Sequence, residues 1–174
     1  MLSFQERNIL NNLYMSNIAI LYSSKYGTTA TICQSIGKQL EAKASVTLVD
    51  IDRKNDICLS DYDTVVLGTS IYAGKPRKQM SQWCAQNQAT VRGKRLFLFV
   101  CGMDKPHAAT ELEAAYPPSL REQAIATTFF EGEYRLETMR FFDRMILQLL
   151  VKVKTPLHRT YDELVKDFAG KIVS

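Results

Sequence analysis

Short apolar runs alternate regularly with segments of helical periodicity, and this alternation constrains the fold more than any other feature of the sequence. The apolar runs are Ile18–Tyr22, Val46–Ile51, Thr64–Gly68, Leu96–Cys101 and Ala124–Phe130. Continuous apolar runs of this length are typical of parallel strands that are buried on both faces. They therefore predict the strands of one central sheet.

The segments between and after these runs have the spacing of helices. Helices are predicted over Thr28–Ala42, Lys78–Thr90, Ala108–Arg121 and Thr160–Ile172, with only a short connection around Ile57 between the second and third runs. In the first helix, Ile32, Ile36 and Leu40 recur every four residues. Strands that alternate with helices predict an α/β fold, a doubly wound five-stranded parallel sheet with helices on both faces.

Length and composition favour one domain. A chain of 174 residues, 46% of them hydrophobic, can bury one full core. The four cysteines and two histidines have no metal-ligand or Cys-x-x-Cys spacing, so we expect reduced thiols and no metal.

Residues 1–16 lack a signal-peptide core, and no run reaches the roughly 20 apolar residues that span a bilayer. We expect an N-terminal extension over 1–16, a domain over 17–174 and a cytoplasmic location.

A hydroxyl-rich turn follows the first apolar run and opens the first helix. It consists of Ser23, Ser24, Lys25, Tyr26, Gly27, Thr28 and Thr29. Backbone N–H groups and hydroxyls at a helix N-terminus favour a bound anion. The turn has neither the Gly-x-Gly-x-x-Gly spacing of a dinucleotide site nor the Gly-Lys-Ser/Thr of a triphosphate loop, so a monophosphate is the better match. The same hydroxyls could serve as simple helix caps.

Two further loops follow the third and fourth predicted strands. Their candidate residues are Thr69, Ser70, Ile71, Tyr72, Ala73 and Gly74 in the first of them, and Cys101, Gly102, Met103 and Asp104 in the second. Turn chemistry alone explains either loop. In a doubly wound sheet, however, ligands bind beyond the carboxyl ends of the strands, where all three loops lie. Tyr72 adds an aromatic face that suits a flat ring system.

These three loops and the strand alternation resemble a flavodoxin domain, from about Asn17 to Ile172. The resemblance implies a strand order of 2-1-3-4-5 and noncovalent binding of FMN. The backbone from Lys25 to Thr29 and the hydroxyls of Ser24, Thr28 and Thr29 would then hold the FMN phosphate. The backbone of residues 69–74 and 101–104 would contact the isoalloxazine ring, and the flavin would carry the redox chemistry without a catalytic side chain.

Within the flavodoxin domains, the chain is most similar to the menaquinone-dependent protoporphyrinogen oxidase family of haem biosynthesis. The sharper similarity is an aromatic-Asp-Arg sequence, Phe142-Asp143-Arg144, in an extra amphipathic helical segment over 135–156. Arg140, Arg144 and Lys152 lie on its polar face. The resemblance implies that this face contacts anionic membrane lipid or a propionate-bearing porphyrinogen, which would place the protein peripherally at the inner face of the cell membrane. A helix packed on the domain with a solvated face explains the same pattern.

The chain departs from ordinary flavodoxins at two points. Tyr26 replaces a phosphate-binding threonine, and the only tryptophan, Trp83, lies in a helix and not in a ring-flanking loop. The expected function is an FMN-dependent oxidoreductase that uses a porphyrinogen and a membrane quinone. The alternative is a flavodoxin-type electron carrier that docks to redox partner proteins. Carriers of this kind are generally acidic, so the net charge of +4 favours the oxidoreductase. Nucleic acid is the least favoured partner, because no recognition module is present.

Overall fold

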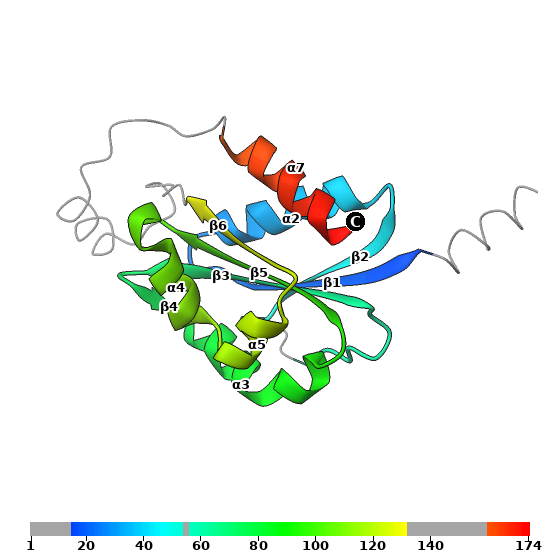
Figure 1. The fold of residues 1–174 in the computed structure, drawn as a ribbon, viewed down its shortest axis with the longest axis horizontal. Coiled ribbons are helices and arrows are strands. Elements are labelled where there is room, and N and C mark those ends of the chain that lie inside the picture. Colours follow the sequence, from blue (N-terminus) through cyan, green and yellow to red (C-terminus); the bar gives the residue numbers. More distant parts are fainter. Residues whose placement is uncertain (1–14, 54–55, 132–159) are drawn as a thin grey trace, which may run out of the picture.

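Parallel strands form the centre of the molecule. The computed structural model describes residues 15–53, 56–131 and 160–174. Its parallel strands are β1 (Ser16–Ser23), β2 (Ala44–Asp50), β3 (Thr64–Tyr72), β5 (Arg95–Gly102) and β6 (Ala126–Glu131). They pair in the order β2-β1-β3-β5-β6, which confirms the predicted 2-1-3-4-5 order of a doubly wound sheet (Figure 1).

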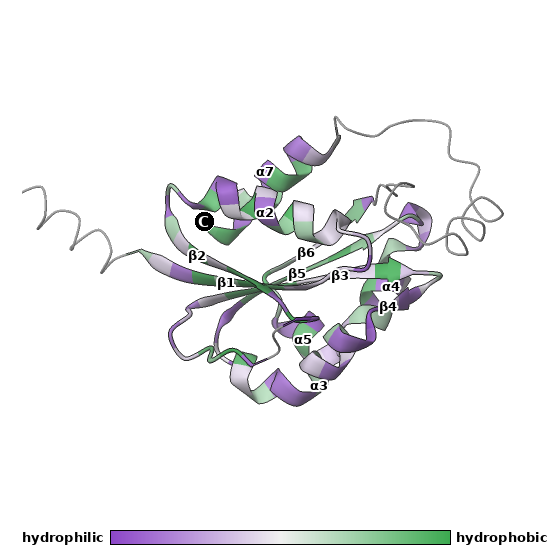
Figure 2. Cartoon of the chain, turned by 180° about the vertical axis from the view of Figure 1, so that it is seen from behind, coloured by the Kyte–Doolittle hydropathy of each residue, from purple (hydrophilic) through white to green (hydrophobic). Residues whose placement is uncertain are grey.

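Helices cover both faces of the sheet, as Figures 1 and 2 show from opposite sides. On one face lie α2 (Thr28–Leu40) and α7 (Thr160–Ile172). On the other face lie α3 (Lys78–Val91), α4 (Ala108–Ala115) and α5 (Pro118–Gln123). The alternation of side chains along β1 sorts Ile18 and Ile20 into the first core and Ala19 and Leu21 into the second. Both faces are therefore apolar, as the continuous apolar runs require.

The third strand continues further than its apolar run predicts. Thr69 to Tyr72, expected in a loop, belong to β3, and a short strand β4 (Lys75–Pro76) pairs antiparallel with its end. The two residues between them, Ala73 and Gly74, have positive φ angles of 49° and 70°. Positive φ at both central residues is the requirement of a tight type I′ hairpin turn. This hairpin places Tyr72 and Lys75 opposite each other at the edge of the sheet.

The helix predicted over Ala108–Arg121 is interrupted. It divides into α4 and α5, with Tyr116 in an extended conformation between them (φ −129°, ψ 135°). A residue before proline is pushed out of the helical region, and Pro117 follows Tyr116 directly. The break lets the buried Tyr116 hydroxyl reach the sheet, 2.9 Å from the carbonyl of Leu67 and 2.7 Å from that of Phe99.

An aromatic cluster packs α7 against the sheet. Phe99 of β5 lies edge-to-face against Phe130 of β6 and Phe168 of α7, with ring centroids 5.3 Å and 6.0 Å apart. The Phe99 ring occupies the space above Gly68 of β3, where a Cβ atom would collide with it. Gly68 is therefore required by packing against the neighbouring strand.

The described residues contain no helix that combines the length and the apolar character needed to cross a bilayer. Most of the predicted N-terminal extension, residues 1–14, lies outside the described ranges. The predicted extra segment over 135–156 also lies outside them.

Replacing Gly68 should destabilise the protein through this contact. We expect Gly68→Ala to lower the free energy of unfolding by about 1–3 kcal/mol, because the new methyl group displaces the Phe99 ring. Gly170→Ala in α7 is the matched control, since a Cβ there meets open space and alanine favours a helix. Urea denaturation measures both variants, and equal stability of the Gly68 variant and the wild type would contradict the packing argument.

Candidate functional site

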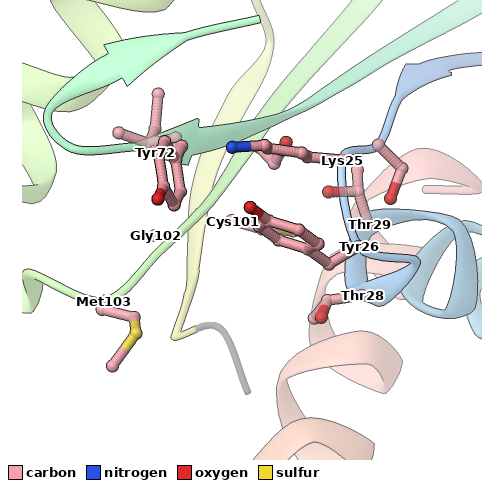
Figure 3. A pocket seen from close by; sticks show the side chains of 11 residues that line it. Lys25, Tyr26, Thr28, Thr29, Tyr72, Cys101, Gly102 and Met103 are labelled. Carbon is pink, nitrogen blue, oxygen red and sulfur yellow. The ribbon is translucent and has the colours of Figure 1, made fainter. Parts of the chain in front are cut away.

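Residues from the ends of β1, β3 and β5 line a cleft of about 370 Å³ at the carboxyl edge of the sheet (Figure 3). The lining residues are Ser24, Lys25, Tyr26, Thr28, Thr29, Ser70, Ile71, Tyr72, Cys101, Gly102 and Met103. All three loops singled out in the sequence contribute.

The remaining candidates of these loops lie around the cleft without lining it. Ser23 and Thr69 are fully buried within the sheet, and Ala73 and Gly74 form the turn between β3 and β4. Gly27 is the N-cap of α2, Asp104 precedes the short 3-10 helix η1 (Lys105–His107), and neither lines the cleft. Arg140, Arg144 and Lys152 lie outside the described residues.

The first loop presents the N-terminus of α2 to the cleft. Gly27 adopts the left-handed conformation (φ 93°), and α2 has no side-chain hydrogen bond at its N-cap. The first intrahelical bond runs from the amide of Thr31 to the carbonyl of Gly27, at 2.9 Å. The N–H groups of a first helical turn have no intrahelical acceptor, and the helix dipole adds positive potential there. No acidic residue occupies this turn. The end of the helix thus suits an anion.

Hydroxyl groups near this helix end are buried with few partners. The hydroxyls of Thr69 and Ser70 form no hydrogen bond within the described part of the chain, and that of Thr29 has only the buried Cys101 thiol beside it. Thr29 and Ser70 both line the cleft. A buried hydroxyl without a partner costs about 1–3 kcal/mol. A polar ligand in the cleft could remove this cost, so these hydroxyls and the α2 N-terminus together fit a phosphate group.

Lys25 connects the first and second loops across the cleft. Its ammonium group lies 3.4 Å from the centroid of the Tyr72 ring and 4.8 Å from that of the Tyr26 ring. The two rings meet at 65° with their centroids 5.9 Å apart (Figure 3). A cation over an aromatic face is attracted by the ring quadrupole. The arrangement places one positive charge and two aromatic rings at the site.

The thiols of Cys101, which lines the cleft, and of Cys33 are buried and are not activated. Burial raises the pKa of Cys101 to about 12, and the nearby Thr29 hydroxyl lowers it only in part. Burial, together with Cys101 and Asp50, raises the pKa of Cys33 well above its usual range. A nucleophilic cysteine needs a lowered pKa, so neither thiol is suited to covalent catalysis. The described residues contain no cluster of side chains that could hold a metal ion.

Glu111 was not identified from the sequence, although it lies beside the third loop. It is 7% exposed, its Oε2 atom has no hydrogen-bond partner among the described residues, and a Cβ at Gly102 would collide with its carboxyl group. Burial and, secondarily, Asp104 raise its pKa, while His107 lowers it. Glu111 shares the inward face of α4 with Ala115, four residues later. In the sequence, this four-residue spacing was the only indication that Glu111 lies on the buried face of the helix.

Comparisons with known proteins agree on the kind of domain. A family model described as flavodoxin domain matches residues 19–160. The chain is 28% identical over 148 residues to a protoporphyrinogen IX dehydrogenase [quinone] of Leishmania major, covering 77% of this chain and 62% of that protein. The chain thus spans less than two thirds of the length of this curated relative.

Solved structures give the same architecture. Oxidised flavodoxin 2 from Bacillus cereus superposes with a TM-score of 0.62 at 18% identity, over 90% of this chain and 97% of that one. The Fusobacterium nucleatum flavodoxin bound to flavin mononucleotide superposes with a TM-score of 0.59 at 13% identity, over 91% and 97%. At such low identity these likenesses concern the fold.

Glu111 should make the stability of the protein depend on pH. Because its folded pKa is raised, the carboxyl group is protonated in both states below about pH 4, and the folded state bears a growing penalty as the pH rises past the ordinary carboxyl pKa of about 4.3. We therefore expect Glu111→Gln to gain stability relative to the wild type over a pH range that begins at about 4 and ends where the carboxyl group of the folded wild type is ionised as well. Glu122→Gln, the same change at an exposed position of α5, is the matched control. Urea midpoints across this pH range measure the difference, and parallel profiles for Glu111→Gln and the wild type would contradict it.

Proposed function

The chain belongs to the flavodoxin domain family, and we propose that it is an FMN-dependent oxidoreductase that oxidises a porphyrinogen and passes electrons to a membrane quinone. The observation that carries the cofactor is the uncapped N-terminus of α2, which meets the buried hydroxyls of Thr29 and Ser70 in one cleft. A Fusobacterium nucleatum flavodoxin of the same fold holds flavin mononucleotide. The proposed substrate is supported by the similarity to the relative of Leishmania major, a protoporphyrinogen IX dehydrogenase [quinone].

The roles of the site residues follow from their positions. The first-turn amides of α2, with the hydroxyls of Ser24, Thr28 and Thr29, hold the phosphate. Residues 70–72 at the end of β3 and residues 101–103 at and after the end of β5 would border the ring, with Tyr72 as the aromatic wall. Bound FMN supplies a reversible acceptor for two electrons. The side chains bind and orient it and leave the redox chemistry to the cofactor.

The proposal places the protein in the cytoplasm with peripheral contact at the membrane, because a quinone acceptor lies in the bilayer. Arg140, Arg144 and Lys152 are proposed to contact anionic lipid or the propionate groups of the substrate. The described residues include no helix that could cross a membrane, and contact at the surface requires none.

A second candidate function is that of an electron carrier. The flavodoxins from Bacillus cereus and Fusobacterium nucleatum align with this chain over 97% of their own length, so this domain is similar to them in size. In that case the protein would have no substrate of its own and would dock to redox partner proteins. The net charge of +4 favours the oxidoreductase, since carriers of this family are generally acidic.

Binding of FMN is the first test. The purified protein should take up one FMN per chain, become yellow and melt at a higher temperature, because a ligand that binds only the folded state stabilises it. Thr29→Val keeps the shape of the side chain and removes the hydroxyl, so we expect it to weaken FMN binding by about 10-fold. Thr90→Val, the same change at an exposed position of α3 that does not line the cleft, is the control. A melting temperature that does not change with FMN would reject the cofactor.

The reaction is the second test. The FMN-loaded protein should oxidise protoporphyrinogen IX with a menaquinone analogue as acceptor, measured by the fluorescence of the porphyrin product. No turnover with quinone, together with rapid reduction by a flavodoxin reductase, would favour the electron carrier.

A further inference from the structure

Two charged residues that sequence reasoning did not identify lie directly behind the first loop. Asp52 follows β2, and Arg77 is the N-cap of α3 just after β4. The Ser23 hydroxyl donates to Oδ1 of Asp52 at 2.8 Å, and the Ser24 amide donates to Oδ2 at 3.2 Å. Arg77 donates from Nη2 to Oδ2 of Asp52 and from Nε to the Ser23 hydroxyl, both at 3.3 Å. We call Asp52 and Arg77, with these contacts, the Asp52–Arg77 clasp.

The clasp is shielded from water. Ser23 is fully buried, and the side chains of Asp52 and Arg77 are 18% and 25% exposed. Hydrogen bonds with an ionised partner are roughly twice as strong as neutral ones, and partial burial limits their screening by salt. Asp52 is itself held in place, because its amide donates to the Asp50 carboxylate at 3.1 Å. The clasp therefore has a defined geometry before any ligand binds.

The contacts lead from the clasp to the start of α2. Asp52 fixes the backbone of Ser24, and the hydroxyl of Ser24 accepts a hydrogen bond from the amide of Gly27 at 3.1 Å. Gly27 is the N-cap whose left-handed conformation opens the helix. Through β4, Arg77 ties the same network to the β3 hairpin that bears Tyr72. Neither Asp52 nor Arg77 lines the cleft, so both act on it through other residues.

We propose that Asp52 and Arg77 are positioning residues that hold the first loop in its phosphate-binding shape and thereby set a preference for FMN over riboflavin. The inference rests on the proposed FMN site. Riboflavin shares the ring of FMN but lacks the phosphate, so a defect confined to the first loop weakens FMN and leaves riboflavin nearly unchanged. Preorganisation of this kind raises affinity because the loop need not be ordered on binding.

The negative charge of Asp52 makes it possible to distinguish a positioning role from a purely electrostatic one. A carboxylate close to a phosphate site repels the phosphate, so if Asp52 acted by charge alone, its neutralisation would tighten FMN binding. If it acts by positioning, neutralisation weakens FMN binding, because asparagine has one acceptor oxygen in place of two. It cannot accept from Ser23 on one side and from Ser24 and Arg77 on the other, and it loses the charge that pairs with Arg77. The two roles predict effects of opposite sign.

The experiment titrates the apoprotein with FMN and with riboflavin and follows the quenching of flavin fluorescence. For Asp52→Asn we expect the Kd of FMN to rise about 10-fold and that of riboflavin to change less than about 3-fold. Arg77→Lys keeps the charge but loses the planar fork that reaches both Asp52 and Ser23, so we expect the same selective loss. Asp167→Asn, an exposed neutralisation on α7, is the matched control with wild-type affinities.

The outcomes separate this inference from the proposed function. A wild-type protein that binds neither flavin rejects the FMN site itself. If the wild type binds FMN, unchanged or tighter FMN binding by Asp52→Asn overturns the positioning role, as does an equal loss of affinity for both flavins. Circular dichroism checks that each variant is folded; should Asp52→Asn not fold, Arg77→Lys decides by the same two criteria.

Discussion

The parallel pairing of β1, β3 and β5 is the constraint on which the site depends. Ser23 at the end of β1 is in register with Thr69 of β3, and Ser70 of β3 is in register with Cys101 of β5. Parallel strands run in the same direction, so the segments that follow them emerge at one edge. Three loops that are far apart in the sequence become the walls of one cleft for this reason. The helices on both faces fix the pairing by burying its apolar side chains.

The charges around the cleft are arranged to leave it attractive to an anion. The lining residues of the described part carry hydroxyls, aromatic rings and the ammonium group of Lys25, but no carboxylate. Nearby acids are engaged elsewhere: Asp52 pairs with Arg77, and Asp104 lies 2.8 Å from the ring of His107, whose pKa it raises. Burial raises the pKa of Glu111, which favours its neutral form. Local pairing and burial thus reduce negative potential where a phosphate is proposed to bind.

Sequence patterns located the strands well because burial on both faces leaves a continuous apolar run. They missed the far end of the third strand and a break in one predicted helix. The third strand extends through polar Thr69 and Ser70, since β4 and β5 supply its hydrogen-bond partners. The helix predicted over Ala108–Arg121 breaks at Tyr116, a break that Pro117 signals locally. Glu111 was passed over because a single acid on a helix is usually solvated.

The sequence by itself determined the α/β class, the strand order through family resemblance, and the three loops that border the cleft, because apolar periodicity and turn composition are local properties. Only the tertiary structure decided which polar groups meet there. The contact between Asp52 and Ser23 joins residues 29 apart, and that between Arg77 and Ser23 joins residues 54 apart. No local pattern encodes such partners, since their distances follow from strand register and from the packing of helices on the sheet. The sequence therefore specified the site's location, and the packed fold specified its geometry.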